Sequence, residues 1–183
     1  MQIRGLFGGA IEAPVFDSFL DASTIRQIPD HQEVFVDVNT QQSLIYELLD
    51  QVGATEKKVA EHHFRQLADD NEAEDCNILS VDTLNPQEVS PLLPQDTSEI
   101  YVLQGQQKIA KFNETNAFNT VEIVMAVVRL TNVKTDFVIS VNAPIKLAQA
   151  SSEQKSVNDT SAVTIDSVRQ EMLTVLKGLQ IKC

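Results

Sequence analysis

Hydrophobic positions along the chain follow two periods, and the shorter one marks a central strand. Alternate residues from Val121 to Leu130 form two faces, and both faces are apolar. A strand of this kind is buried on both sides, so we expect it in the middle of a sheet that helices cover. The short connection Thr131 to Lys134 leads into a second strand at Phe137 to Val141. Such a connection predicts an antiparallel pair.

Three other stretches repeat apolar residues at the spacing of a helix. The first helix is predicted from Thr40 to Gly53, the second from Thr55 to Leu67 and the third from Ile165 to Lys177. Short apolar runs predict the remaining strands, and Gly105 is expected to form a turn or bulge between the last two. These strands are Val34–Val38, Ile78–Leu84, Glu99–Leu103 and Lys108–Phe112, preceded by one or two short strands within Leu6–Phe16 that bend at Gly8 and Gly9. The order of elements predicts an α+β fold in which an antiparallel sheet is sandwiched between helices, an α/β/α arrangement.

Length and composition favour one domain over residues 1–183. The chain has 183 residues, of which 43% are hydrophobic, and such a chain buries enough surface to fold without a metal or disulfide. Residues 146–161 are polar and poor in large apolar side chains, which predicts a mobile loop.

Charge narrows the choice of partner. The net charge is −12, from 26 acidic and 14 basic residues. Such a field repels nucleic acids and anionic membranes and favours a basic protein surface, although solubility alone would also explain it. Two cysteines without a zinc-site spacing indicate a reducing compartment, and we expect neither a signal peptide nor a membrane span.

The sequence offers little catalytic chemistry. It lacks the motifs of serine hydrolases, zinc proteases and P-loop proteins, so we expect neither an enzyme nor a cofactor nor a metal site. His63 falls on the apolar stripe of the second helix, which favours a hydrogen-bonded core histidine over a ligand. Cys76 fits an inert cysteine at a strand start better than a redox thiol. The acidic run Asp69 to Asp75 is typical of a solvated loop.

An acidic turn is the strongest candidate for a binding site. Asp30 and Glu33 follow Pro29 and precede an apolar strand. In a turn, this spacing of three directs both carboxylates to one side, where they would suit a Lys or Arg of a partner. Asp21, a little earlier, has the position of an N-cap for a short helix that carries Ile25 and Ile28 on its apolar side and ends before Pro29.

Several segments, in order along the chain, resemble the Ran guanine nucleotide release factor family (the Mog family). An apolar start with two glycines followed by P-D-x-Q-E-V is an unusual combination. The resemblance is weakest from Asn71 to Asp96 and from Lys146 to Ser161. The matching segments are Leu6–Ile11, Asp21–Arg26, Pro29–Val36, Gln42–Leu49, Ala126–Leu130 and Thr135–Pro144.

This resemblance implies a function that composition did not show. Members bind the GTPase Ran, promote release of its nucleotide and support nuclear protein import, sometimes together with a Ran-binding-domain protein. It also implies a PsbP-like fold, residence in nucleus and cytoplasm, and Ran binding through the acidic positions Asp30 and Glu33. Gln32, Asp21 and Arg26 also match the family pattern, although Asp21 could serve only as a helix cap. We expect a monomer.

Two other classes of function stay open at this point. The chain could be a non-catalytic adaptor module that binds an apolar peptide or ligand in a cleft. A hydrolytic enzyme is a third hypothesis, but it needs a nucleophile and a base that converge, and the sequence shows none.

Overall fold

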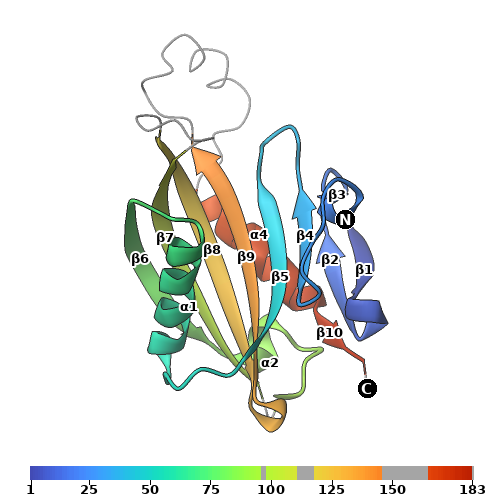
Figure 1. Ribbon diagram of the computed structural model, residues 1–183. Helices are drawn as coiled ribbons and strands as arrows, with labels where there is room; N and C mark the ends of the chain where they lie inside the picture. Colours follow the sequence, from blue (N-terminus) through green and yellow to red (C-terminus); the bar gives the residue numbers. More distant parts are fainter. Residues whose placement is uncertain (96–97, 111–117, 146–164, 183) are drawn as a thin grey trace.

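The computed structural model describes residues 1–95, 98–110, 118–145 and 165–182. The predicted mobile loop at residues 146–161 and the last residue, Cys183, lie outside the described residues. Most of the described chain forms one large sheet with a helix on each face (Figure 1). The prediction of an α+β fold with an antiparallel sheet between helices is confirmed.

Seven strands form the main sheet in the order β3-β4-β5-β9-β8-β7-β6, and all neighbours are antiparallel. A smaller sheet has the order β1-β2-β10 and joins the two ends of the chain. The strands of the main sheet are β3 (Leu20–Asp21), β4 (Gln32–Val36), β5 (Ser43–Asp50), β6 (Asp75–Leu84), β7 (Ser98–Ala110), β8 (Phe118–Leu130) and β9 (Thr135–Ile145). Those of the smaller sheet are β1 (Gln2–Leu6), β2 (Ile11–Val15) and β10 (Gln180–Ile181).

Two long helices cover the main sheet, α1 on one face and α4 on the other (Figure 1). The short α2 and several single turns of 3-10 helix lie in the connections of the described chain. The bounds are α1 (Lys57–Asp70), α2 (Pro86–Val89), α4 (Ile165–Gly178), η1 (Phe7–Gly9), η2 (Ala22–Thr24) and η4 (Thr131–Val133).

Strand β8 divides the interior into two cores. Its even-numbered side chains from Val124 to Val128 pack with α4, whereas its odd-numbered ones from Ile123 to Val127 pack with α1. Each of these side chains is at most 2% exposed. The prediction of a central strand with two buried faces is confirmed, as are α1, α4 and the β8–β9 pair.

The helix predicted from Thr40 to Gly53 is wrong, because this segment forms β5. Leu44 and Tyr46 point into the core under α4, and Leu49 packs on the core under α1. A strand with apolar residues on both faces also has apolar residues at helical spacing, so periodicity alone does not distinguish such a strand from a helix. The eight-residue ladder from β5 to β9 and the pairing with β4 decide for a strand.

Gly105 does not break a strand, contrary to the prediction, because β7 runs through it without interruption. The bulge lies opposite, in β6, where the register shifts between Ile78 and Ser80. A Cβ atom on Gly105 would lie 2.6 Å from Cζ of Phe64 in α1. The glycine therefore lets the ring of Phe64 approach the sheet closely.

Candidate partner-binding site

The acidic segment forms the turn that the sequence predicted. The backbone N–H of Gln32 donates a hydrogen bond to the carbonyl oxygen of Pro29 over 3.0 Å, which closes a four-residue turn. Asp30 lies at its tip with an exposed side chain, and β4 begins at Gln32. The turn thus presents one carboxylate to solvent at the start of a rigid strand.

Glu33 has a different environment from Asp30. It is half-buried, and its Oε1 accepts a hydrogen bond from the backbone N–H of Phe7 at 3.0 Å. Phe7 has a φ of 52°, followed by 70° at Gly8 and 92° at Gly9, so η1 is a left-handed turn. A non-glycine residue adopts such a φ at some cost, and the bond to Glu33 offsets part of it. Glu33 therefore holds η1 against β4.

Asp21 is the N-cap that the sequence predicted, but the helix it caps is short. Its Oδ1 accepts from the backbone N–H of Ser23 at 2.9 Å, and η2 ends at Thr24. The predicted apolar side of this helix is wrong at Ile25, which is 67% exposed. The turn ends well before Pro29, because one 3-10 turn satisfies the backbone locally.

These segments enclose a hollow of about 390 Å³ at the start of β4. Four of the five predicted site residues line it, namely Asp21, Asp30, Gln32 and Glu33. Arg26 is exposed and is not in the lining, so the hollow brings together three carboxylates, and its described lining includes neither Lys nor Arg. Phe7, Gly8, Ser23, Ile28, Pro29 and Val34 complete the lining. An uncompensated group of carboxylates beside apolar side chains suits a basic side chain with an aliphatic stem.

Glu47 belongs to this region, although the sequence pattern did not indicate it. It lies on β5, directly opposite Gln32 in the register of β4 and β5. Its Oε2 accepts from Nε2 of Gln32 at 2.6 Å and lies 3.1 Å from Nε2 of His31. The helix predicted for this segment hid the contact, whereas a strand would have placed Glu47 beside the acidic turn.

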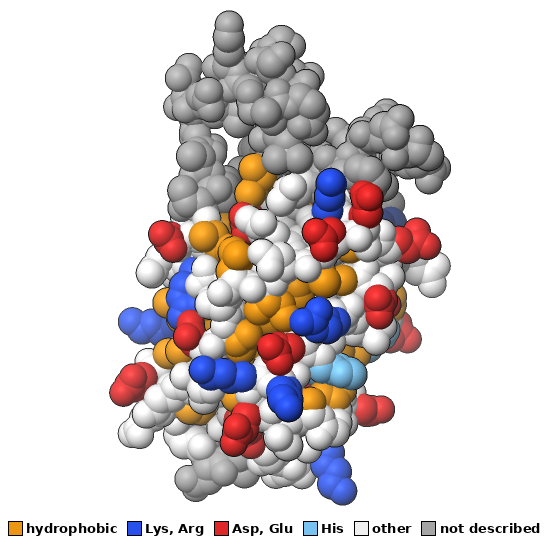
Figure 2. Space-filling model, turned by 90° about the vertical axis from the view of Figure 1, so that its left-hand side faces the viewer, with side chains coloured by type: hydrophobic (Ala, Val, Ile, Leu, Met, Phe, Trp, Pro, Cys, Tyr) orange, Lys and Arg blue, Asp and Glu red, His pale blue; other side chains and the backbone are white. Residues whose placement is uncertain are grey.

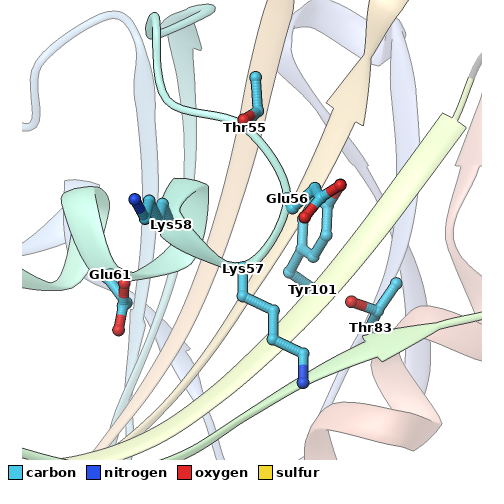
Figure 3. A pocket seen from close by; sticks show the side chains of 7 residues that line it. All are labelled: Thr55, Glu56, Lys57, Lys58, Glu61, Thr83 and Tyr101. Atoms are coloured by element: carbon cyan, nitrogen blue, oxygen red, sulfur yellow. The ribbon is translucent and has the colours of Figure 1, made fainter.

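A second hollow, of about 620 Å³, lies at the start of α1 (Figure 3). Its lining mixes both charges with a tyrosine whose hydroxyl donates to Glu99 at 2.6 Å. Burial, and then the bond to Glu99, raise the pKa of Tyr101 above its ordinary value. The lining residues are Thr55, Glu56, Lys57, Lys58, Glu61, Thr83 and Tyr101. Figure 2 shows that Lys, Arg, Asp and Glu are interspersed on this side of the molecule. The second hollow therefore carries charges of both signs, whereas the acidic hollow is lined by negative charges.

A buried charge cluster under α1 has a structural role. Asp136 accepts from Nε of Arg129 at 2.8 Å and lies 2.9 Å from Nε2 of His63. Burial alone would raise the pKa of Asp136, but hydrogen bonds from His63 and Arg129 lower it to about 2. Arg129 also donates to the carbonyls of Val52 and Ala54, which fixes the connection from β5 to α1. The prediction of a hydrogen-bonded core histidine at His63 is confirmed.

Other candidate chemistry is sparse in the described part of the chain. Cys76 is half-buried, with Nη1 of Arg65 at 3.9 Å from its sulfur. Among the described residues, no group of three or more His, Cys, Asp or Glu is arranged to hold a metal ion. No described helix is long and apolar enough to cross a membrane.

Comparison with known proteins places the chain in a known family. The family model described as "Ran-interacting Mog1 protein" matches residues 4–144. The chain belongs to the Mog1 family. A Dictyostelium discoideum protein named "Probable ran guanine nucleotide release factor" is 40% identical, over 98% of this chain and 92% of that protein. The "Nuclear import protein mog1" of Schizosaccharomyces pombe is 37% identical, over 93% of this chain and 90% of the relative.

Solved Mog1 structures share the fold. The crystal structure of the Saccharomyces cerevisiae Ran-binding protein Mog1p superposes with a TM-score of 0.73 at 28% identity, covering 98% of this chain and 94% of that one. The match to the Mog1 family model spans the whole acidic hollow, from Phe7 to Val34. The family resemblance inferred from the motifs is thereby confirmed.

Proposed function

We propose that this protein binds the GTPase Ran through the acidic hollow, promotes release of its guanine nucleotide and so supports nuclear protein import. The names of the family and of its relatives supply the partner. The acidic hollow is the proposed binding surface, because Asp21, Asp30 and Glu33 all line it. Such a surface attracts a basic patch and speeds encounter with it.

Charge suggests how binding would promote release. A Lys or Arg of Ran drawn into the hollow no longer supports the bound nucleotide or its switch segments. Because coupling between two ligands is reciprocal, bound nucleotide must weaken the grip of this protein by the same factor. Truncating one partner of a desolvated charge pair costs about 2–5 kcal/mol, and a micromolar complex amounts to only about 8 kcal/mol. One or two carboxylates can therefore decide whether the complex forms.

The test is the rate at which labelled GDP and labelled GTP leave Ran, with and without the full-length protein. We expect release to quicken with increasing protein until it saturates, and the complex to weaken as salt screens the charges. Ran with excess unlabelled nucleotide alone provides the basal rate. A rate that stays basal at every concentration, for both nucleotides, would contradict the proposal.

The remaining assignments are part of the same proposal. Residues 1–183 act as one Ran-binding domain, as a monomer, without catalysis of their own and without nucleic acid. A Ran-binding-domain protein is a further partner, and the protein works in nucleus and cytoplasm. The relatives' names as release factors and import proteins support a regulatory role in nuclear import, and the net charge of −12 is the reason for leaving out nucleic acid. Both hollows described above are lined by charged side chains, which counts against the adaptor that binds an apolar peptide.

A further inference from the structure

The acidic turn is fastened to β5 by one side chain. Glu47 directs Oε2 at two neighbouring residues of the turn, with Nε2 of Gln32 at 2.6 Å and Nε2 of His31 at 3.1 Å. Its side chain is 23% exposed, whereas that of His31 is 51% exposed. Glu47 therefore lies beneath the turn and is partly covered by it.

Backbone bonds hold the same turn from the other side. The N–H of Leu48 donates to the carbonyl oxygen of His31 at 2.9 Å, and the N–H of Gln32 closes the turn on Pro29. Together with the contacts of Glu47, these bonds attach the residues on both sides of Asp30. Asp30 lies at the exposed tip of this attached turn, where its side chain can meet a partner.

We propose that Glu47 is a positioning residue that holds the Pro29–Gln32 turn so that Asp30 faces the partner. The proposal rests on the proposed function, because it needs Asp30 to contact a basic residue of Ran. A preorganised turn loses less conformational freedom on binding than a loose one, which raises affinity without a new contact. The role expected of Glu47 is that of a hydrogen-bond acceptor rather than of another charge in the hollow.

Two substitutions separate these roles. Glu47→Gln removes the charge but keeps a carbonyl oxygen that can accept from Gln32. Glu47→Ala removes both the charge and the acceptor. Glu61, half-buried on α1 at the other hollow, provides the matched control Glu61→Ala. Thermal unfolding of each variant checks that it folds, and Glu47→Gln keeps the test valid if the alanine variant does not.

The experiment measures the affinity of the full-length variants for nucleotide-free Ran at low and at high salt. We expect Glu47→Ala to bind about fivefold more weakly, which corresponds to about 1 kcal/mol. Glu47→Gln and Glu61→Ala should stay within about twofold of the wild type, and the salt dependence should be unchanged.

Three results would overturn the inference. If Glu47→Gln binds as weakly as Glu47→Ala and with a smaller salt dependence, Glu47 is itself a contact charge. If Glu47→Ala binds like the wild type while Asp30→Ala binds weakly, the turn needs no such support, although the proposed site stands. If Asp30→Ala also binds like the wild type, the proposed binding site is wrong and the role of Glu47 falls with it.

Discussion

Glu33 combines a structural bond with a charge, and paired substitutions should separate the two. Its Oε1 accepts from the backbone N–H of Phe7 at 3.0 Å while the carboxylate lines the acidic hollow. Glu33→Ala removes both the acceptor and the charge. Glu33→Gln keeps an acceptor oxygen of nearly the same reach and removes only the charge.

The magnitude follows from the type of bond and its exposure. A hydrogen bond to a charged group contributes about 1.5–3 kcal/mol, and a neutral one about 0.5–1.5 kcal/mol. Glu33 is half-buried, so the lower end of the range applies. We expect Glu33→Ala to lower the free energy of unfolding by about 1.5 kcal/mol and Glu33→Gln by about 0.5 kcal/mol.

Urea unfolding of both variants measures the contribution of the hydrogen bond to stability, and their affinity for Ran measures the contribution of the charge to binding. The slope of unfolding free energy against urea should be unchanged, so that a shift in midpoint reports stability. Glu61→Ala and Glu61→Gln, at the other hollow, are the matched controls. If Glu33→Ala is as stable as the wild type, the bond to Phe7 does not hold η1 and the reasoning fails.

Three further predictions concern the stability of the fold. Asp136→Asn should lose about 2 kcal/mol of stability at neutral pH, because hydrogen bonds outweigh burial and lower the pKa of Asp136 from 3.8 to about 2. Urea unfolding from about pH 4 to about pH 2 should show the difference between variant and wild type shrinking, since the wild type loses the stabilisation from ionised Asp136 as this carboxylate is protonated. Glu171→Gln should raise Tm at pH 7 and have little effect below pH 4, because burial and then repulsion from Asp37 raise the pKa of Glu171, so its ionisation destabilises the fold as pH rises. Gly105→Ala should cost about 1–3 kcal/mol in thermal unfolding, because the added Cβ would lie 2.6 Å from the Phe64 ring and 2.8 Å from the backbone carbonyl oxygen of Asn77, and the cost should be smaller when it is measured in a Phe64→Leu background.

The elements that the sequence predicted well are those with one clear hydrophobic period. The central strand Val121 to Leu130 is apolar on both faces, and the helix with His63 on its buried side carries a single apolar stripe. Strand β5 was predicted as a helix because its apolar residues pack in both cores, and their spacing also fits the apolar stripe of a helix. Its pairing with β4 and β9 depends on residues far away in the sequence, which no local pattern reports.

The candidate site was predictable where it depends on local chemistry. Pro29 and the spacing of two carboxylates predicted the turn, and the position of Asp21 predicted a cap. The bond from Phe7 to Glu33 crosses 26 positions of sequence, and Glu47 reaches Gln32 across 15. Such contacts follow from the order of strands in the sheet, so they became visible only with the fold.

The affinity of Asp30→Lys for Ran decides whether the acidic hollow is the binding site. The matched variant is Glu61→Lys, which changes the net charge by the same amount at the hollow beside α1. If the acidic hollow is the binding site, Asp30→Lys should bind at least about tenfold more weakly than the wild type while Glu61→Lys binds nearly normally. Equal affinities of the two variants, whether both reduced or both unchanged, would contradict the account.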